Sequence, residues 1–374
     1  MLKTVAVAAD MVTSYGWGTD LCWEGLFSGI TAIRPIERFS THNLQTGNAA
    51  TIPGLTMKPD ESLVMQMLRP LLDKGSIEIP HDTFVILATT SGDIEFVQRF
   101  VSGEENNPEK SLPDCLLDKI MLLTGTCGKG IVVSSACASS SIAVSRAASL
   151  IRNKVYDCVL VIGCDCVSEF VTAGFSSLMA LDPDVAKPFD KNRQGLSLGE
   201  AAGYMLLMSE ERAAKGNIAV MGEVAGWGLT NDANHITGPS RDGSGLYQAI
   251  YSALKSAGIA ENKIGSISAH GTGTVYNDSM EMKAIKKVFA ESILPVYSVK
   301  GGIGHTLGAA GLLEIIISFK SLDKKVTPPT VNLSDIDEEA EGWVFPYPQT
   351  FESSYTLSTN SGFGGVNSAL ILKI

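Results

Sequence analysis

The sequence has few charged residues and no excess of basic ones. Lys, Arg, Asp and Glu make up 18% of its 374 residues, and 40 acidic residues outnumber 29 basic ones, for a formal net charge of −11. This balance argues against nucleic acid or an anionic membrane as the main partner, because both are themselves negatively charged. Since hydrophobic residues account for 45% of the chain, we expect a globular protein with a large buried core.

Long apolar runs and a disulfide framework are also missing. The internal stretch Leu312–Phe319 is interrupted by Glu314 and is far too short to cross a membrane. At the N-terminus, the apolar residues 5–9 are too few for the hydrophobic region of a signal peptide. The seven cysteines are odd in number, which is not typical of a disulfide-stabilised extracellular domain. These features predict a cytoplasmic protein with free thiols and no membrane anchor.

What the sequence does have is an alternation of strand-like and helix-like segments. In the first part, buried strands are expected at 5–9, 83–89, 130–133, 158–163 and 203–209, and helices at 20–28, 62–74 and after residue 137. In the second part, strands are expected at 218–227, 264–269 and 296–299, and helices at 245–257, 279–289 and 309–322. The polar segments 38–60, 103–114 and 210–216 are expected to be surface connections.

The strand–helix–strand order predicts parallel strands joined by right-handed crossovers. Because a similar order appears twice, we expect an internal duplication of βαβ units. The fold class is therefore α/β, with layered sheets and covering helices.

Cys137 stands where a strand is expected to turn into a helix. The β-branched run Gly130–Val133 precedes it, and apolar residues recur at helical spacing between Ile142 and Ile151. A thiol at the N-terminus of a buried helix is expected to have a lowered pKa and to attack as a thiolate. For a single cysteine, a small side chain filling core space is the commoner alternative.

Two of the five histidines follow expected strands in glycine-rich segments. His270 begins His-Gly-Thr-Gly-Thr, and His305 ends the segment Lys300-Gly-Gly-Ile-Gly-His. Strand ends are the usual ligand sites of α/β sheets, so both histidines are candidates for catalysis. Either one alone is more often a structural hydrogen-bonding residue.

Two other kinds of site are disfavoured by residue spacing. The glycine-rich segment 301–311 lacks the lysine and serine or threonine spacing of a phosphate-binding loop. Cys158, Cys164 and Cys166 lack the paired spacing of a zinc site and are expected to be buried thiols. We expect no metal.

Together, these segments resemble the β-ketoacyl-acyl-carrier-protein synthases of the elongating, Cys-His-His type, in the thiolase-fold condensing enzyme superfamily. The matching motifs are Ser-Ala-Cys137-Ala-Ser-Ser-Ser, Ala-His270-Gly-Thr-Gly-Thr, Val-Lys300-Gly-Gly-Ile-Gly-His305 and Asn-Ser-Gly-Phe363-Gly-Gly. The match runs from residue 83 onward. It implies a thiolase-like fold of two duplicated α/β halves in a layered α-β-α-β-α architecture. Residues 1–215 would carry the nucleophile and the dimer interface, and residues 216–374 both histidines and the lysine.

The resemblance implies a role for each motif residue. Cys137 would take an acyl chain from the phosphopantetheine of a carrier protein as a thioester. The backbone N–H groups of Cys137 and Phe363 would form the oxyanion hole. His270 and His305 would hold the malonyl thioester carbonyl, so that decarboxylation leaves a stabilised enolate.

Further residues are implied as supports of the reaction and of substrate binding. Lys300, paired with Glu281, would orient His305. Thr272 and Thr274 would contact the pantetheine arm through their hydroxyl groups.

The acyl chain would enter past a gate. Phe363 resembles the family's gating phenylalanine, and residues 231–239 resemble the mobile loop that accompanies it, although a phenylalanine beside glycines also suits a core cap. The candidate walls of the acyl pocket are Phe175, Leu196 and Ile142, for each of which ordinary core packing is an equal alternative.

The implied activity is decarboxylative Claisen condensation of an acyl thioester with malonyl-acyl-carrier protein, in fatty-acid or polyketide-type biosynthesis. Its partners would be the carrier protein, acyl and malonyl thioesters and a second copy of the chain, with no resident cofactor, because phosphopantetheine carries the substrates. The basic residues considered for an acidic carrier are Arg69, Lys74, Lys187, Lys191 and Arg193.

Three alternatives remain at this stage. A catalytically silent chain-length partner of a heterodimer usually lacks the nucleophile, which this chain keeps. A Cys-His hydrolase would leave Lys300 and one histidine unexplained. A binding protein without turnover would form no covalent acyl adduct.

Overall fold

The computed structural model describes residues 2–73, 78–127, 129–290 and 292–374. The first half contains β1 (Thr4–Thr13), β2 (Gly16–Trp17), α1 (Thr19–Phe27), β3 (Arg34–Pro35), β4 (Asn48–Ala50), α2 (Leu63–Asp73), β5 (Phe84–Ala88), α3 (Glu95–Ser102), η1 (Pro108–Ser111), α4 (Pro113–Thr124), β6 (Gly130–Val133), α5 (Ser139–Arg152), β7 (Cys158–Asp165), α6 (Glu169–Ser177), β8 (Leu198–Gly199), β9 (Ala201–Ser209) and α7 (Glu210–Lys215). The second half contains β10 (Gly222–Asn231), α8 (Ser244–Ala257), η2 (Glu261–Lys263), β11 (Ile264–Ser268), α9 (Val275–Phe289), β12 (Val296–Tyr297), α10 (Lys300–Ile303), η3 (Leu307–Ala309), α11 (Ala310–Lys324), β13 (Val326–Thr327), β14 (Gln349–Thr350), β15 (Tyr355–Gly362) and β16 (Val366–Lys373).

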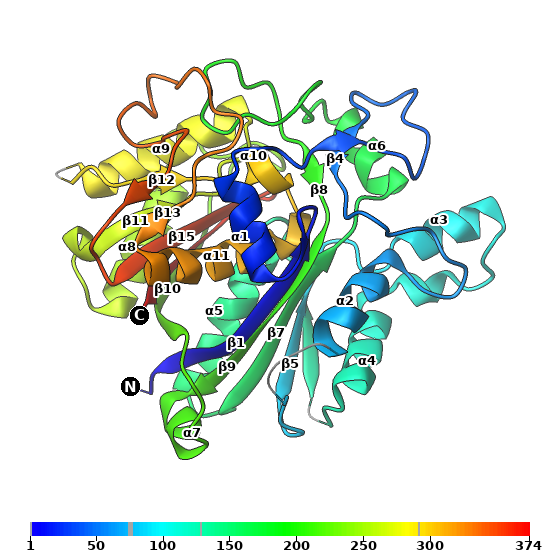
Figure 1. The fold of residues 1–374 in the computed structure, drawn as a ribbon, viewed down its shortest axis with the longest axis horizontal. Coiled ribbons are helices and arrows are strands. Elements are labelled where there is room, and N and C mark those ends of the chain that lie inside the picture. The colour runs from blue at the N-terminus through cyan, green and yellow to red at the C-terminus, as the bar shows by residue number, and fades with distance from the viewer. Residues whose placement is uncertain (1, 74–77, 128, 291) are drawn as a thin grey trace.

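The two halves share one strand order (Figure 1). The first half pairs its strands as β6-β5-β7-β9-β1, and the second as β12-β11-β15-β16-β10. In each half the first three strands are parallel, and the last two join antiparallel. The halves meet where β1 pairs with β10, at Val5–Glu223 and Ala6–Gly222. The expected duplication of βαβ units is confirmed.

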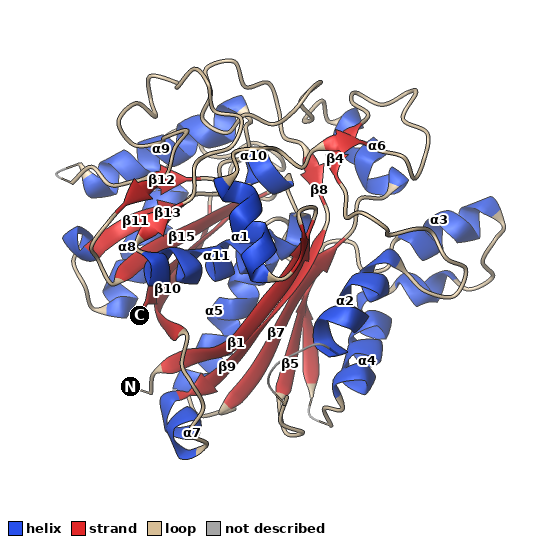
Figure 2. Ribbon diagram, viewed as in Figure 1, coloured by secondary structure: helices blue, strands red, loops and turns tan. Residues whose placement is uncertain are grey.

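The helices form three layers around these strands (Figure 2). Helices α2 and α4 pack on the outer face of the first half's strands, and α8 and α9 on the outer face of the second half's. Helices α5 and α11 lie between the halves, contact each other and share one buried cluster with strands from both. This arrangement is the α-β-α-β-α layering that the resemblance implied.

Several expected boundaries were wrong. Residues 210–215 form a helix, because the Ser209 hydroxyl caps its N-terminus by accepting the N–H of Arg212 at 3.2 Å. The strand expected at 218–227 is β10, which begins and ends four residues later. The segment 38–60 holds the short strand β4, and 103–114 holds η1 and the start of α4.

The structure also bears on the helix expected at 62–74, on the cysteines and on membrane-spanning segments. The helix expected at 62–74 is α2, with Lys74 outside the part of the chain that the structure describes. All seven cysteines are free. Among the described residues, none of the helices has both the length and the apolar character needed to cross a membrane.

Candidate active site

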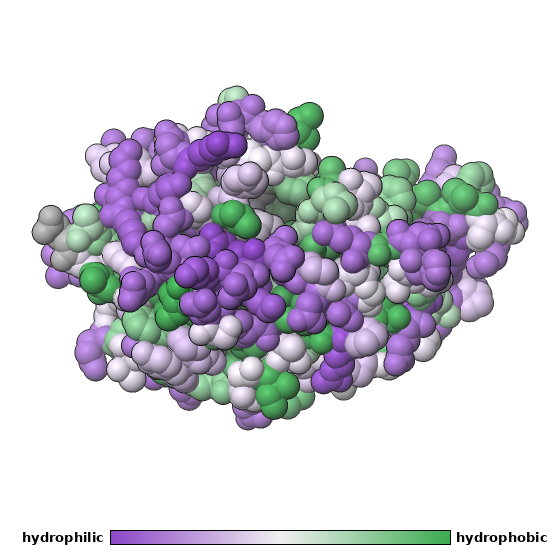
Figure 3. Space-filling view, turned by 90° about the horizontal axis from the view of Figure 1, so that it is seen from above, coloured by the Kyte–Doolittle hydropathy of each residue, from purple (hydrophilic) through white to green (hydrophobic). Residues whose placement is uncertain are grey.

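A cavity of about 450 Å³ opens on the face of the molecule formed by the segments that follow β6, β11 and β15. Figure 3 views the molecule from above and shows this face hollowed near its middle. The residues that line the cavity come from both halves and include eight of the predicted site residues: Cys137, Phe175, Leu196, His270, Thr272, Thr274, His305 and Phe363. Lys300 and Glu281 lie behind this lining.

Cys137 lies on the tight turn between β6 and α5 that the sequence predicts. Ala136, before it, has φ of 49°, in the left-handed region. The Ser139 hydroxyl holds the turn by accepting the N–H of Ser135 at 2.8 Å and donating to the carbonyl of Ala136 at 2.6 Å. Cys137 is therefore fixed just before the N-terminus of a buried helix.

The expected lowering of the Cys137 thiol pKa was wrong. Burial raises the pKa of this thiol to about 11, because a thiolate in an enclosed site loses its hydration. The charge of Lys300 and the backbone N–H groups of Phe363 and Cys137 act in the opposite direction but do not prevail. The resting side chain is a thiol at neutral pH.

The two histidines converge on this thiol. The Sγ atom of Cys137 and one ring nitrogen each of His270 and His305 lie within 4.8 Å of one another. The imidazole rings stand edge to face, with centroids 5.2 Å apart and planes at 84°. Burial and the charge of Lys300 hold the pKa of both imidazoles well below the usual range, so both are neutral.

Hydrogen bonds at Nδ1 determine which nitrogen of each ring carries the proton. The Nδ1 atom of His305 accepts the N–H of Leu307 at 3.1 Å. The Nδ1 atom of His270 faces two donors, Lys300 Nζ at 3.2 Å and Asn360 Nδ2 at 3.4 Å. Both neutral rings must therefore carry their proton on Nε2. The Nε2 atom of His305 has no partner among the described residues, which leaves a free donor in the cavity wall.

The predicted pairing of Lys300 with Glu281 was wrong. The buried Nζ of Lys300 contacts Glu314, together with the carbonyl oxygen and Nδ1 of His270. Lys300 therefore orients His270. The expectation that it would orient His305 was wrong. Glu281 accepts the backbone N–H groups of His270 at 2.7 Å and Gly271 at 2.8 Å, and so fixes the loop that carries the histidine.

Two buried residues of this network were missed by the sequence analysis. Glu314 lies one turn into α11 and accepts from Lys300 and from Asn360 Nδ2, the latter at 2.6 Å. Burial raises the pKa of Glu314, whereas Lys300 and Asn360 act to lower it. The signal for Glu314 was a carboxylate that interrupts the apolar stretch Leu312–Phe319. For Asn360 the signal was only its place beside the glycine-rich residues 362–365, which form the glycine loop.

The glycine loop brings a second backbone N–H close to the thiol. A Cβ on Gly362 would lie 3.1 Å from the backbone nitrogen of Cys137, so only glycine allows this approach without displacement. Gly364 and Gly365 follow with φ of 83° and 75°. The backbone N–H groups of Phe363 and Cys137 both act on the sulfur of Cys137. This is the pair of donors expected for an oxyanion hole.

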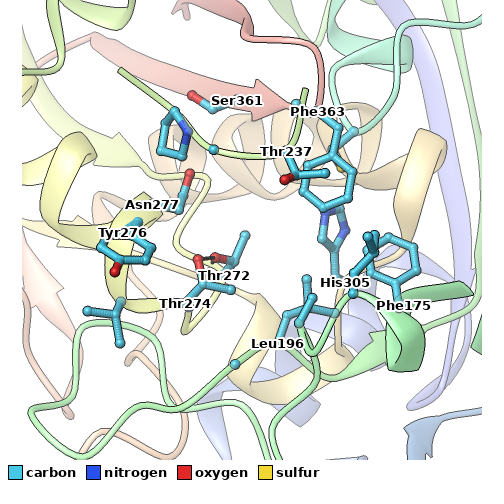
Figure 4. Close-up of a pocket in the computed structure, with 18 of the residues that line it drawn as sticks. Phe175, Leu196, Thr237, Thr272, Thr274, Tyr276, Asn277, His305, Ser361 and Phe363 are labelled. Atoms are coloured by element: carbon cyan, nitrogen blue, oxygen red, sulfur yellow. Dashed lines mark hydrogen bonds between the residues drawn. The ribbon is translucent and has the colours of Figure 1, made fainter. Parts of the chain in front are cut away.

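The Thr272–Thr274 loop forms one wall of the cavity (Figure 4). The two threonine hydroxyls lie 2.9 Å apart. Asp278, buried on α9, accepts the N–H groups of Thr272 at 3.0 Å and Gly273 at 3.1 Å and so fixes the loop. Both threonines line the cavity.

The opposite wall is apolar. The rings of Phe175 and Phe363 stack with centroids 5.8 Å apart, beside His305 and Leu196 (Figure 4). Ile142 does not line the cavity, because its place on α5 lies outside it. Phe175 and Leu196 thus line the cavity and Ile142 does not, while the role of any of them as a wall of an acyl pocket stays a prediction.

The loop 231–239 contacts the glycine loop. Gly364 donates its N–H to the carbonyl of Ile236 at 2.7 Å, and the N–H of Asp232 reaches the carbonyl of Gly365 at 2.7 Å. The Nδ2 atom of Asn231 donates to the Gly364 carbonyl at 2.9 Å. The two segments are thus linked, as the resemblance implied.

Cys137, His270 and His305 are close enough together to hold a metal ion, but their surroundings do not suit one. A histidine that binds a metal through Nε2 keeps its proton on Nδ1 and donates it to an acceptor. Here the Nδ1 atoms face the donors Leu307 N–H and Lys300 Nζ. The arrangement favours two Nε2–H donors directed at a substrate.

The described basic residues that were expected to meet an acidic partner differ in how accessible they are. Arg193 is buried and forms an ion pair with Asp337 at 2.6 Å, so it is unavailable to a partner. Arg69 forms an ion pair with Glu61 at 3.0 Å. Lys191 is exposed.

Comparisons with known proteins agree with this geometry. The models "Beta-ketoacyl synthase, N-terminal domain" and "Beta-ketoacyl synthase, C-terminal domain" match residues 101–213 and 221–334. The 3-oxoacyl-[acyl-carrier-protein] synthase 2 of Vibrio cholerae is 30% identical, with 99% of each chain covered, and that of Rhizobium meliloti is 30% identical, with 100% of this chain and 99% of the relative covered.

Solved structures of similar proteins cover the whole chain. A beta-ketoacyl synthase from Burkholderia phymatum has a TM-score of 0.91 at 26% identity, with 100% of this chain and 99% of that one covered. The ishigamide ketosynthase/chain length factor has a TM-score of 0.89 at 29% identity, with the same coverage. Sequence motifs, fold and site geometry thus lead to one conclusion: the chain belongs to the beta-ketoacyl synthase family.

Proposed function

We propose that this chain condenses an acyl thioester on Cys137 with malonyl-acyl-carrier protein, releasing carbon dioxide and a 3-oxoacyl-carrier protein. The observation that carries the proposal is the placement of one thiol and two Nε2–H imidazole donors around one cavity. A silent chain-length partner would have no use for this constellation.

In the first step the sulfur of Cys137 attacks the acyl carbonyl of a carrier-bound thioester. The oxygen that becomes negative is stabilised by the backbone N–H groups of Cys137 and Phe363. The new C–S bond forms, the bond to the carrier's sulfur breaks, and that sulfur takes the proton given up by Cys137. The thiol pKa near 11 means that this proton must leave as the attack occurs.

In the second step the malonyl thioester carbonyl accepts the Nε2–H groups of His270 and His305. The bond to the carboxylate breaks, carbon dioxide departs, and the electron pair forms an enolate whose oxygen the two donors stabilise. The enolate carbon attacks the acyl carbon on Cys137, the C–S bond breaks, and the sulfur leaves as a thiolate that takes a proton from solvent. Neutral imidazoles suit this role, because an imidazolium would be more easily deprotonated by the enolate.

The proposed partner is an acyl carrier protein that presents its substrates on phosphopantetheine, with no resident cofactor in this chain. Thr272 and Thr274 are placed to accept the polar arm, and the exposed Tyr276 lies at the cavity mouth. We further propose a cytoplasmic homodimer that uses the region 83–165. The family also contains pairs of a ketosynthase with a chain length factor, as in the ishigamide protein and in ApeO with ApeC of Xenorhabdus doucetiae.

The test is incubation with acyl- and malonyl-carrier proteins, followed by intact-mass measurement of the chain. One acyl adduct, located at Cys137, and release of carbon dioxide are expected. Cys137→Ala should abolish both the adduct and condensation, whereas Cys137→Gln should retain malonyl decarboxylation. Cys127→Ser, at an exposed cysteine, is the matched control and should change neither. An acyl adduct on another cysteine would contradict the proposal.

A further inference from the structure

The ring of His305 depends on a backbone group in an unfavourable conformation. Its Nδ1 accepts the N–H of Leu307, which keeps the ring proton on Nε2. Leu307 has φ of 53°, in the left-handed region that costs a residue with a side chain about 1–2 kcal/mol. Contacts on either side of Leu307 must therefore hold it there.

On the N-terminal side, the backbone of His305 forms hydrogen bonds with residues at and next to β8. His305 donates its N–H to the carbonyl of Ser197 at 2.7 Å and accepts the N–H of Gly199 at 3.0 Å. On the C-terminal side, the anchor is a side chain. The N–H of Gly308 donates to Oδ2 of Asp165 at 2.7 Å.

Asp165 lies at the end of β7 and is fully buried. Five donors from the residues after β5 hold its carboxylate: the hydroxyls of Thr89, Thr90 and Ser91 and the N–H groups of Thr90 and Ser91, at 2.8 to 3.1 Å. With Gly308, these donors occupy both oxygens. Asp165 does not line the cavity and has no contact with the place of the substrate.

We propose that Asp165 is a positioning residue for His305. Its carboxylate anchors Gly308, which keeps the Leu307 N–H on Nδ1 and so keeps the Nε2–H directed into the cavity. A residue of the first half thereby fixes the proton of a histidine from the second half. The consequence for catalysis rests on the proposed function, because it takes His305 to hold the malonyl carbonyl.

The first test is Asp165→Asn. An amide offers one acceptor oxygen where two are used, and its NH2 group would face N–H donors. Malonyl decarboxylation is expected to fall by about tenfold, which is less than the roughly 10²–10³ lost when an oxyanion donor is deleted. Acylation of Cys137 is expected to be unchanged or faster, because the negative charge of Asp165 raises the pKa of the thiol.

The direct readout is NMR of protein labelled with ¹⁵N-histidine, in which His305→Gln identifies the signals of His305. The wild-type ring is expected as the Nε2–H tautomer, and Asp165→Asn should mix or reverse the tautomers. A purely structural role would not select this one ring. His270 should keep its tautomer, since Lys300 and Asn360 still hold its Nδ1.

Gly308→Ala is the second variant, in case Asp165→Asn does not fold. An added Cβ would lie 2.6 Å from Asp165 Oδ2 and 2.9 Å from the backbone nitrogen of Thr90, so it should displace the Gly308 N–H from Asp165 while the chain keeps the carboxylate. Thr356→Val is the stability control. It removes a buried hydroxyl that bonds Ser266 far from His305, so it should lower stability without changing the tautomer or the ratio of the two rates.

The outcomes separate the two proposals. An unchanged His305 tautomer in both Asp165→Asn and Gly308→Ala would overturn the role of Asp165, as would equal losses of acylation and decarboxylation. If the wild-type protein neither acylates nor decarboxylates, the proposed function fails, and the NMR comparison still decides whether Asp165 positions His305.

Discussion

The two halves of the molecule share one strand order, but the side chains that follow equivalent strands differ in their chemistry. In the first half, β5 and β7 pair as far as Ala88 and Gly163; in the second, β11 and β15 pair as far as Ser268 and Ser358. Two residues beyond these points, the first half carries Thr90 and Asp165, and the second carries His270 and Asn360.

Each of these pairs interacts, but with different consequences. Thr90 donates to Asp165, whose oxygens are fully occupied by donors. Asn360 instead shares the Nδ1 of His270 with Lys300, which leaves the other ring nitrogen for the cavity. Equivalent pairs of backbone positions thus carry a fully hydrogen-bonded carboxylate, Asp165, in one half, and in the other an imidazole, His270, with one ring nitrogen left for the cavity.

The connections that lead into the middle helices α5 and α11 also differ between the halves, in their length and in the side chains they carry. In the first half, a short turn places Cys137 directly before α5. In the second half, residues 298–309 intervene before α11 and carry Lys300 and His305. The proposed mechanism uses both connections, because the thiol comes from the short one and an imidazole donor from the long one.

The largest effect is expected from removing Lys300, the buried cation that contacts His270 in the second half. Lys300→Met would leave the fully buried Glu314 without its charge partner, which should destabilise the protein by about 3–5 kcal/mol in urea unfolding. The double variant Lys300→Met with Glu314→Gln should recover much of that loss. Equal unfolding midpoints for wild type and Lys300→Met would show that the pair has no such role.

The next largest effect is expected from Asn360→Asp, which gives the second half the same side chain that the first half carries at the equivalent position, Asp165. The Asn360 amide donates to Glu314, so a carboxylate there would replace a hydrogen bond with charge repulsion. Condensation should fall by about two orders of magnitude, as when a preorganised donor is lost. Steady-state carbon dioxide release measures this. Added Glu314→Gln should restore part of the rate, and a failure to do so would contradict the explanation.

A moderate effect concerns the short connection alone. Because burial raises the pKa of the Cys137 thiol to about 11, its alkylation by iodoacetamide should be slow at neutral pH. The rate should rise about tenfold per pH unit from pH 7 to about pH 10, in proportion to the thiolate fraction. Peptide mapping distinguishes Cys137 from the exposed Cys127. A rate that is already maximal at pH 7 would mean that the helix N-terminus outweighs burial.

The smallest effect tests a feature that the halves have in common. Burial raises the pKa of Glu95 in the first half and of Glu281 in the second to about 7. Between pH 4.5 and 7 the native state holds a proton that the unfolded state has lost, so stability falls as pH rises.

Glu95→Gln should therefore flatten the pH dependence of the unfolding free energy by about 1–3 kcal/mol. Urea unfolding at pH 5 and pH 8 measures it. Glu109→Gln, at an exposed carboxylate, should leave the slope unchanged. The same slope for wild type and Glu95→Gln would show that Glu95 is ionised throughout.

Most of this arrangement could be predicted from local sequence. The β-branched run before Cys137 and the glycines around His270, His305 and Phe363 marked strand ends, and strand ends at one edge of a sheet converge. The alternation of apolar segments was sufficient for the duplicated α/β fold. These are features that neighbouring residues determine.

What could not be predicted depends on distances between remote segments. Glu281 precedes Lys300 in the sequence and Glu314 follows it, and both are plausible partners at that level. Only the packing of α11 against β15 shows that Glu314 is the partner. The thiol pKa failed for a related reason. A helix N-terminus is visible in sequence, whereas the depth of burial that outweighs it is a property of the assembled layers.

The pairing of β1 with β10 and the shared packing of α5 and α11 also bear on how this chain can be cut. A fragment ending near residue 216 would expose the apolar face of α5, and its complement the apolar face of α11. Neither piece should be soluble when expressed alone. Co-expression should let each piece cover the other, and recovered activity would then report reassembly, since thiol and imidazoles lie on opposite pieces.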